Sequence, residues 1–146
     1  MRNCDGCTLC CKLMPIKSEN KLAFEWCKFC NPKEGCTIYD TRYEECKVYQ
    51  CLWTWADGTL GELIKDFKPN KVKFLMNFNQ KTQAIEITND PAFPNAWKKY
   101  SPILEYIGDQ IPVIVFTKGL PLGIGKMAQI KFNEPKEPRY GFTPST

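Results

Sequence analysis

Hydrophobic residues follow a regular period only in the second half of the chain. From Val72 to Phe78 every second residue is apolar, which predicts a strand over residues 71–78 with one face buried. A turn at residues 79–81 and the alternation of residues 83–88 predict its antiparallel partner. The almost continuous apolar run at residues 111–117 is typical of a central strand.

Helical spacing occurs in two further segments. Residues 59–67 place their apolar side chains on one face, and Pro69 is expected to end this helix. Residues 94–107 also predict helix, with a restart at Ser101, because the Ser-Pro pair supplies an N-cap and a proline in the first turn. Residues 128–132 predict a last, edge strand. These elements together form a small β-β-α-β layer.

The first 51 residues show no such period, and they hold all nine cysteines of the chain. They contain few large apolar side chains, so a fold of their own needs another source of stability. A structural zinc site can supply on the order of 10 kcal/mol, because its binding energy becomes folding energy. We interpret all nine cysteines as candidate metal ligands: Cys4, Cys7, Cys10, Cys11, Cys27, Cys30, Cys36, Cys46 and Cys51.

The spacing of the cysteines favours metal over disulfides. A C-x-x-C-x-x-C-C run begins at Cys4, and Cys27 and Cys30 form a second C-x-x-C, a turn that brings two sulfurs to one centre. An odd number of clustered thiols is atypical of a disulfide framework. We see no apolar export signal at the N-terminus and expect a reducing, cytoplasmic setting. Adjacent Cys10 and Cys11 point in different directions, so they would serve two different metals or one of them would stay out; the pattern favours two metal sites over one.

The ordered motifs resemble a known family. They are C-x-x-C-x-x-C-C-K from Cys4, W-C-x-x-C from Trp26, G-C-T-I-Y-D-T-R from Gly35 and C-x4-C-L-W from Cys46. Together they resemble the YkgJ-type family, described as a zinc- or iron-chelating domain, although this chain has Tyr43 where the family has proline. The resemblance implies metal chelation and no particular reaction. It also implies a core of eight ligands, with Cys30 as the additional cysteine: Cys4, Cys7, Cys10, Cys11, Cys27, Cys36, Cys46 and Cys51.

Zinc and iron–sulfur clusters both accept four thiolates, so the ligand type does not choose between them. We favour zinc, because the second half of the chain has no flavin or nicotinamide fingerprint that would indicate redox chemistry. An iron–sulfur electron-transfer protein is the alternative, since Cys4, Cys7 and Cys10 have ferredoxin-like spacing. A zinc-ribbon-like nucleic-acid binder is a further alternative.

An adaptor or metal-handling role is favoured over catalysis. Catalytic zinc often uses histidine and keeps an open position, and the chain contains no histidine. If the protein is a zinc enzyme, Cys30 is the candidate nucleophile. Glu86, Asp90 and Glu105 have no partner motif and are interpreted as surface charges. The glycines between residues 119 and 126 do not have the spacing of a phosphate-binding loop.

The formal net charge of +4 does not by itself indicate a nucleic-acid partner. Four thiolates with one Zn²⁺ carry a net charge of −2, so two such sites would bring the total close to zero. The basic residues near the cysteines are then expected to compensate thiolate charge. They are Lys12, Lys28, Lys33, Arg42 and Lys47.

The sequence therefore predicts an α+β protein with an irregular, cysteine-rich, metal-bound N-terminal lobe packed on the β-β-α-β layer. We expect the metal-binding lobe at residues 1–56, the small α+β lobe at residues 57–133 and an extended, proline-containing tail at residues 134–146. No apolar run approaches the roughly 20 residues that a membrane span needs. Metal ions are the expected partners, and a protein partner stays open.

Overall fold

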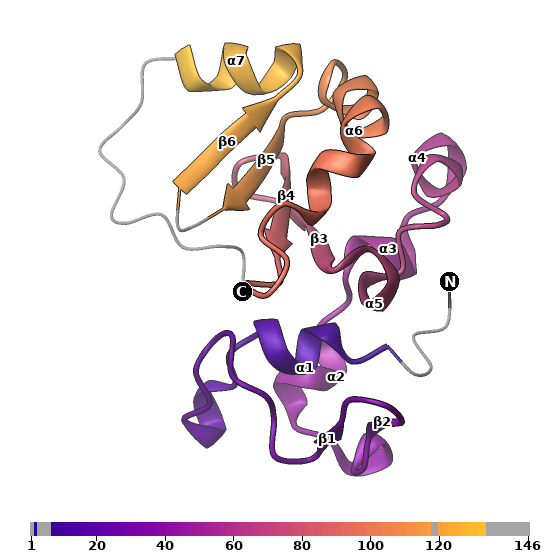
Figure 1. The fold of residues 1–146 in the computed structure, drawn as a ribbon, viewed down its shortest axis with the longest axis vertical. Coiled ribbons are helices and arrows are strands. Elements are labelled where there is room, and N and C mark those ends of the chain that lie inside the picture. The colour runs from indigo at the N-terminus through magenta and orange to yellow at the C-terminus, as the bar shows by residue number, and fades with distance from the viewer. Residues whose placement is uncertain (1, 3–6, 118–119, 134–146) are drawn as a thin grey trace.

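The structure is a computed structural model that describes residue 2, residues 7–117 and residues 120–133. Cys4 and the segment 134–146 lie outside the described residues. The chain is mixed α/β, with one four-stranded and one two-stranded sheet (Figure 1). Within the described ranges, no helix is long and apolar enough to cross a membrane.

The four-stranded sheet is built by the second half of the chain. Its strands are β3 (Phe74–Asn79), β4 (Ala84–Asn89), β5 (Val113–Thr117) and β6 (Leu120–Ile124), in that spatial order. β3 and β4 form the predicted antiparallel hairpin, and β5 runs parallel to β4. The predicted central position of residues 111–117 is confirmed, because β5 lies between β4 and β6.

Parallel neighbours such as β4 and β5 require a crossover connection, and here it is helical. It consists of η3 (Ala96–Tyr100), a 3-10 helix, and α6 (Ser101–Gly108). The predicted restart at Ser101 is confirmed. Tyr100 is the N-cap, however, and the Ser101 hydroxyl donates a hydrogen bond to the Lys98 carbonyl (2.7 Å).

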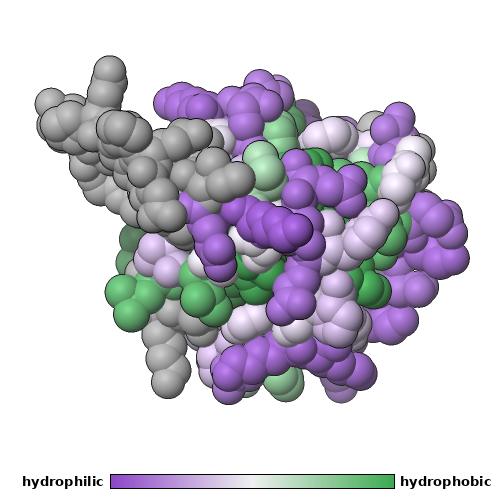
Figure 2. All heavy atoms as spheres, turned by 90° about the horizontal axis from the view of Figure 1, so that it is seen from above, coloured by the Kyte–Doolittle hydropathy of each residue, from purple (hydrophilic) through white to green (hydrophobic). Residues whose placement is uncertain are grey.

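Helices pack at both edges of the sheet. α6 and α7 (Lys126–Asn133) contact β5 and β6, whereas α3 (Leu52–Trp55) and α5 (Pro69–Val72) contact β3. α4 (Gly58–Leu63) lies between α3 and α5 in the chain. Figure 2 looks onto the end of the molecule where α6 and α7 lie, and there the described surface is mostly hydrophilic, with separate hydrophobic patches.

Two glycines allow α7 to follow the sheet closely. A Cβ atom on Gly108 would lie 2.2 Å from the carbonyl oxygen of Ile124, and one on Gly125 would lie 2.4 Å from the Gly108 carbonyl carbon. Gly125 also has φ +81°, a conformation that side chains disfavour. The end of α6 and the start of α7 can therefore approach only because both positions lack a side chain.

Several predictions about local structure are wrong. Residues 128–132 belong to α7, and the edge strand is β6. The helix predicted over residues 59–67 ends at Leu63, and Pro69 begins α5, where a first-turn proline costs no hydrogen bond. The strand predicted to be half-buried is covered on both faces, because Leu75 and Asn77 are buried as well as Phe74 and Met76.

The prediction of surface charges is also wrong for two of the three acidic residues. Glu86, in the middle of β4, is 1% exposed, and Asp90, just after β4, is 5% exposed. Asn79 donates a hydrogen bond to the Glu86 carboxylate (3.3 Å). Only Glu105 is exposed, as expected.

The N-terminal part consists of short elements around the cysteines. They are α1 (Leu9–Leu13), η1 (Lys17–Glu19), β1 (Cys30–Asn31), β2 (Gly35–Cys36), η2 (Tyr39–Thr41) and α2 (Glu44–Val48).

Only the two ends of this part share the hydrophobic core. Leu9, Leu13 and Leu52 belong to the same buried cluster as Phe74 and Ile85 of the sheet. None of residues 17–50, all of which the structure describes, is fully buried, although Tyr49 near their end is partly buried against the core. The cysteine-bearing segment is therefore anchored by α1 and α3, while its middle has no apolar core of its own.

Candidate metal centre

Helix α1 carries the adjacent Cys10 and Cys11, and both of its ends are held by distant side chains. At the N-terminal end, the Asn70 side-chain oxygen accepts hydrogen bonds from the backbone N–H groups of Thr8 (2.8 Å) and Leu9 (2.9 Å). Thr8 itself makes no side-chain cap. Asn70 therefore supplies, from α5, the acceptor that an N-cap residue normally supplies locally.

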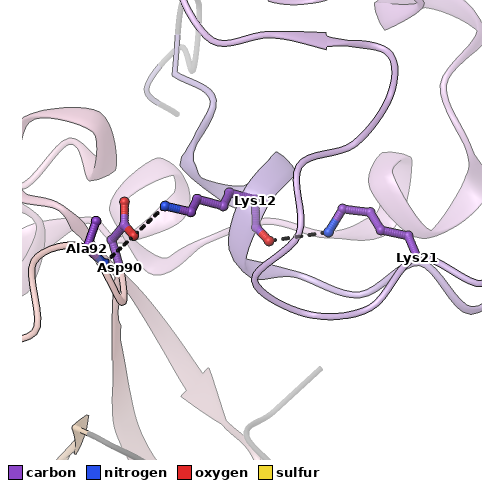
Figure 3. Close-up of polar contacts among 4 residues, drawn as sticks. All are labelled: Lys12, Lys21, Asp90 and Ala92. Atoms are coloured by element: carbon purple, nitrogen blue, oxygen red, sulfur yellow. Dashed lines mark hydrogen bonds and ion pairs between the residues drawn. The ribbon is translucent and has the colours of Figure 1, made fainter.

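Lys21 holds the C-terminal end of the same helix. Its ammonium donates hydrogen bonds to the carbonyls of Met14 and Leu22 and to that of Lys12 (3.3 Å; Figure 3). Its backbone N–H and carbonyl form reciprocal hydrogen bonds with those of Ile16, as an isolated antiparallel bridge. Carbonyls at a helix C-terminus lack intrahelical donors, so a lysine is a favourable partner for them.

A first thiol group consists of Cys7, Cys10 and Cys51. Electrostatic effects of Cys7 and Cys51 contribute to the raised pKa of Cys10, and Cys7 contributes in the same way to that of Cys51. Burial is the main cause that raises the pKa of Cys51, which belongs to the hydrophobic core. The Cys7 thiol also lies 3.6 Å from the Asn70 oxygen. These three cysteines come from the two sides of the cysteine-rich segment.

A tyrosine lies beside this first group. The Tyr49 hydroxyl donates a hydrogen bond to Asn77 of β3 (2.7 Å). Burial raises the pKa of Tyr49 far above its ordinary value, and the three thiols of the first group add to this effect. Tyr49 thus connects the first thiol group to the buried polar residues of the sheet.

A second thiol group consists of Cys11, Cys27, Cys30, Cys36 and Cys46. Cys30 and Cys36 face each other across the β1–β2 ribbon, so their side chains share one face. The Cys27 backbone N–H donates a hydrogen bond to the Cys11 carbonyl (3.0 Å), and the Cys30 backbone N–H donates one to the Cys27 carbonyl (3.0 Å). Burial raises the pKa of Cys46, with further contributions from the thiols of Cys11, Cys27 and Cys36.

Cys11 is the thiol that connects the two groups. Hydrogen bonds from Cys10 and Cys30, together with the Lys21 ammonium, lower the pKa of Cys11 to about 6 against the opposing effect of burial. The hydrogen bond to Cys11 raises the pKa of Cys10, and burial together with Cys11 raises that of Cys30 to about 12. At neutral pH, Cys11 therefore carries the negative charge that its two neighbours solvate as thiols.

Lys21 is a cation among the cysteines that the sequence pattern does not single out. Burial lowers the pKa of Lys21, whereas the nearby thiols of Cys27 and Cys11 oppose this effect. Of the basic residues expected to compensate thiolate charge, Arg42 partly offsets the raised pKa of Cys46, whereas Lys28, Lys33 and Lys47 are exposed. Nothing in the local motif distinguishes Lys21, because its position depends on the carbonyls at the end of α1.

Lys12 has a different partner from the one expected. It forms an ion pair of 2.7 Å with Asp90, with side chains 18% and 7% exposed (Figure 3). Asp90 also accepts a hydrogen bond from the Ala92 backbone (3.0 Å). The pair joins helix α1 to the end of β4, so it links the cysteine-rich segment to the sheet.

The donor set fits a thiophilic metal, but the sulfurs do not form a coordination shell. None of the eight described cysteines is in a disulfide, and no histidine competes with them. Within residues 7–117 and 120–133, however, no three Cys, Asp or Glu side chains are arranged so that they could hold an ion together. Cys4, the remaining predicted ligand, lies outside the described residues.

Comparisons with known proteins give no relative: the chain matches no family model, no curated protein and no solved structure.

Proposed function

We propose that this protein binds metal through cysteine thiolates, with zinc as the favoured ion, and acts as an adaptor or metal-handling factor. The observation that carries the proposal is that one segment lacks an apolar core and holds several cysteines whose thiols influence one another. No residue of 17–50 is fully buried, yet Cys27, Cys30, Cys36 and Cys46 lie there, and nearby thiols help to raise the pKa of Cys30 and Cys46. A segment without an apolar core needs a different source of stability, and bound zinc would supply it.

Two sites account for the thiols better than one. The first thiol group, Cys7, Cys10 and Cys51, would reach four ligands with Cys4, which is the usual number for structural zinc. The second group has five candidates, so one of them would stay outside the shell. The resemblance to the YkgJ-type family makes Cys30 the additional one. Because the sulfurs do not converge on shared points, binding would draw each group inward.

The residues of this chain would prepare the ligands for a bound ion. Thiolates are the binding form, so a cation near them and hydrogen-bond donors to them favour binding. Lys21 places an ammonium beside Cys11 and Cys27. When bound, zinc would supply cross-linking of distant segments. The chain would contribute the deprotonated sulfurs and the charge that compensates them.

The test is metal analysis of the full chain purified without oxygen. We expect a colourless protein with zinc bound, and Cys-to-Ser substitution should reduce the zinc content in two separate sets. Brown colour with iron and sulfide would replace zinc by the iron–sulfur alternative. Protein with all thiols reduced and less than one equivalent of any metal would refute the proposal.

A further inference from the structure

We propose that Asn70 and Lys21 are positioning residues that hold opposite ends of α1, Asn70 for the first thiol group and Lys21 for the second. The inference rests on the proposed function. It adds that two residues outside the cysteine motifs each position a different group of thiols. Asn70 contacts the start of α1 from α5 and lies beside Cys7, whereas Lys21 contacts the end of α1 from the loop after η1, and the thiols of Cys27 and Cys11 act most strongly on its charge.

Asn70 is placed to orient the first thiol group. Its oxygen accepts hydrogen bonds from the backbone N–H groups of Thr8 (2.8 Å) and Leu9 (2.9 Å), which lie between Cys7 and Cys10 in the chain. The same oxygen lies 3.6 Å from the Cys7 sulfur. Its amide nitrogen donates to the Thr8 hydroxyl (3.4 Å). Asn70 lies 61 residues after Leu9, so these bonds fix α1 against the element α5 that contacts the sheet. Without them, the start of α1 would have backbone donors without protein acceptors.

Lys21 is placed to orient the second thiol group. Its ammonium binds carbonyls that follow Cys11 at the end of α1, and the thiols of Cys27 and Cys11 act on its charge more strongly than that of Cys10 does. Backbone hydrogen bonding between Cys27 and Cys11 joins these two segments directly. A thiolate complex with zinc carries negative charge, so a fixed ammonium at this point favours the loaded form as well as the geometry. Residues that support ligands in this way typically change metal affinity tenfold or more when they are lost.

The experiment measures protection of individual cysteines in the zinc-loaded full chain. Protein is reduced, loaded with zinc, and exposed to an alkylating reagent together with a competing chelator. Mass spectrometry then gives the rate of modification for each cysteine. Asn70→Leu removes the hydrogen bonds, and Asn70→Ala is measured in parallel as a smaller change. Lys21→Met removes the ammonium, and Lys21→Arg restores a cation.

Matched controls change the same elements without the proposed contacts. Lys71→Ala lies on α5 beside Asn70, and Lys17→Met removes one positive charge from the segment before Lys21; both side chains are exposed. We expect both controls to retain wild-type protection of every cysteine. A loss of protection in the controls equal to that in the variants would overturn the inference.

The predicted pattern is selective. Asn70→Leu and Asn70→Ala should accelerate modification of Cys7, Cys10 and Cys51 about tenfold and leave Cys27, Cys36 and Cys46 protected. Lys21→Met should do the reverse, and Lys21→Arg should restore protection, which a merely structural effect on the fold would not do. Equal loss in both groups, or no loss in either, would overturn the inference while the wild type still binds zinc. A wild type that binds no zinc would instead refute the proposed function.

Discussion

Removing one partner of the ion pair between Lys12 and Asp90, which links the cysteine-rich segment to the sheet, should be strongly destabilising. The Lys12 Nζ and Asp90 Oδ1 atoms are 2.7 Å apart, and the side chains of Lys12 and Asp90 are 18% and 7% exposed. Removing one partner of a buried pair typically costs about 3–5 kcal/mol, because the other charge stays buried. Lys12 keeps some contact with solvent and faces the Trp26 ring at 5.7 Å. We therefore expect Asp90→Ala to cost about 3 kcal/mol, at the lower end of this range.

Two further variants separate the charge from the hydrogen bonds. Asp90→Asn keeps an acceptor for the Ala92 backbone and for Lys12, so it should cost only about 1–2 kcal/mol. In a double-mutant cycle with Lys12→Met, the coupling energy should be about 2 kcal/mol. Urea denaturation followed by far-UV circular dichroism measures each free energy of unfolding.

The pair between Lys65 and Glu62 is the matched control. It has the same separation of 2.7 Å, but its side chains are 55% and 72% exposed. Glu62→Ala should leave the denaturation midpoint unchanged, because solvent screens exposed pairs. If Asp90→Ala also leaves the free energy of unfolding within about 0.5 kcal/mol of wild type, burial does not strengthen this pair and the reasoning is refuted.

Three other outcomes follow from the structure. Gly125→Ala should cost about 2–4 kcal/mol in thermal denaturation, because its Cβ would lie 2.4 Å from Gly108 at φ +81°; an unchanged Tm would contradict this. In reduced, metal-free protein, alkylation of Cys11 should reach half its maximal rate near pH 6, since its pKa is about 6, whereas a midpoint near pH 9 would show that Cys10 and Cys30 do not donate to it. Chelation of the zinc-loaded, reduced protein should speed amide hydrogen exchange in residues 17–50 and leave it slow in β4 and β5. Unchanged hydrogen exchange in residues 17–50 would count against a structural metal.

The sheet was predictable where hydrophobic period and turn residues agree. The β3–β4 hairpin, the central β5 and the helical restart at Ser101 each follow from local pattern. Residues 128–132 were not predictable in this way, because a short apolar alternation fits either a strand or a helix. The close approach of Gly125 to Gly108, which sets the start of α7, depends on residues far apart in the chain.

The burial of acidic residues could not be read from the sequence. Asp90 is buried because Lys12, which lies 78 residues earlier, neutralises it. Neither residue stands in a motif, so only the packing of α1 beside the end of β4 reveals the pair. Glu86 is similar, since its neighbours on β3 become evident only with the register of the hairpin.

The cysteines of the candidate site follow from the sequence, whereas the residues that hold helix α1 do not. The clustering of cysteines and the adjacent Cys10 and Cys11 suggested two sites, and this stays a prediction, because no three Cys, Asp or Glu side chains of the described residues are arranged to hold an ion. Asn70 and Lys21 carry no sequence signal. Their roles arise from the ends of α1, whose backbone donors and acceptors must be satisfied by whatever side chain lies nearest.

Metal content per chain tests the central claim most directly. The full chain is purified without oxygen, its thiols are kept reduced, and zinc, iron and other transition metals are quantified against protein. Two equivalents of zinc in a colourless protein would agree with thiolates holding an ion in each group. A reduced, folded protein that contains no bound metal and gains none when zinc is supplied would contradict the account.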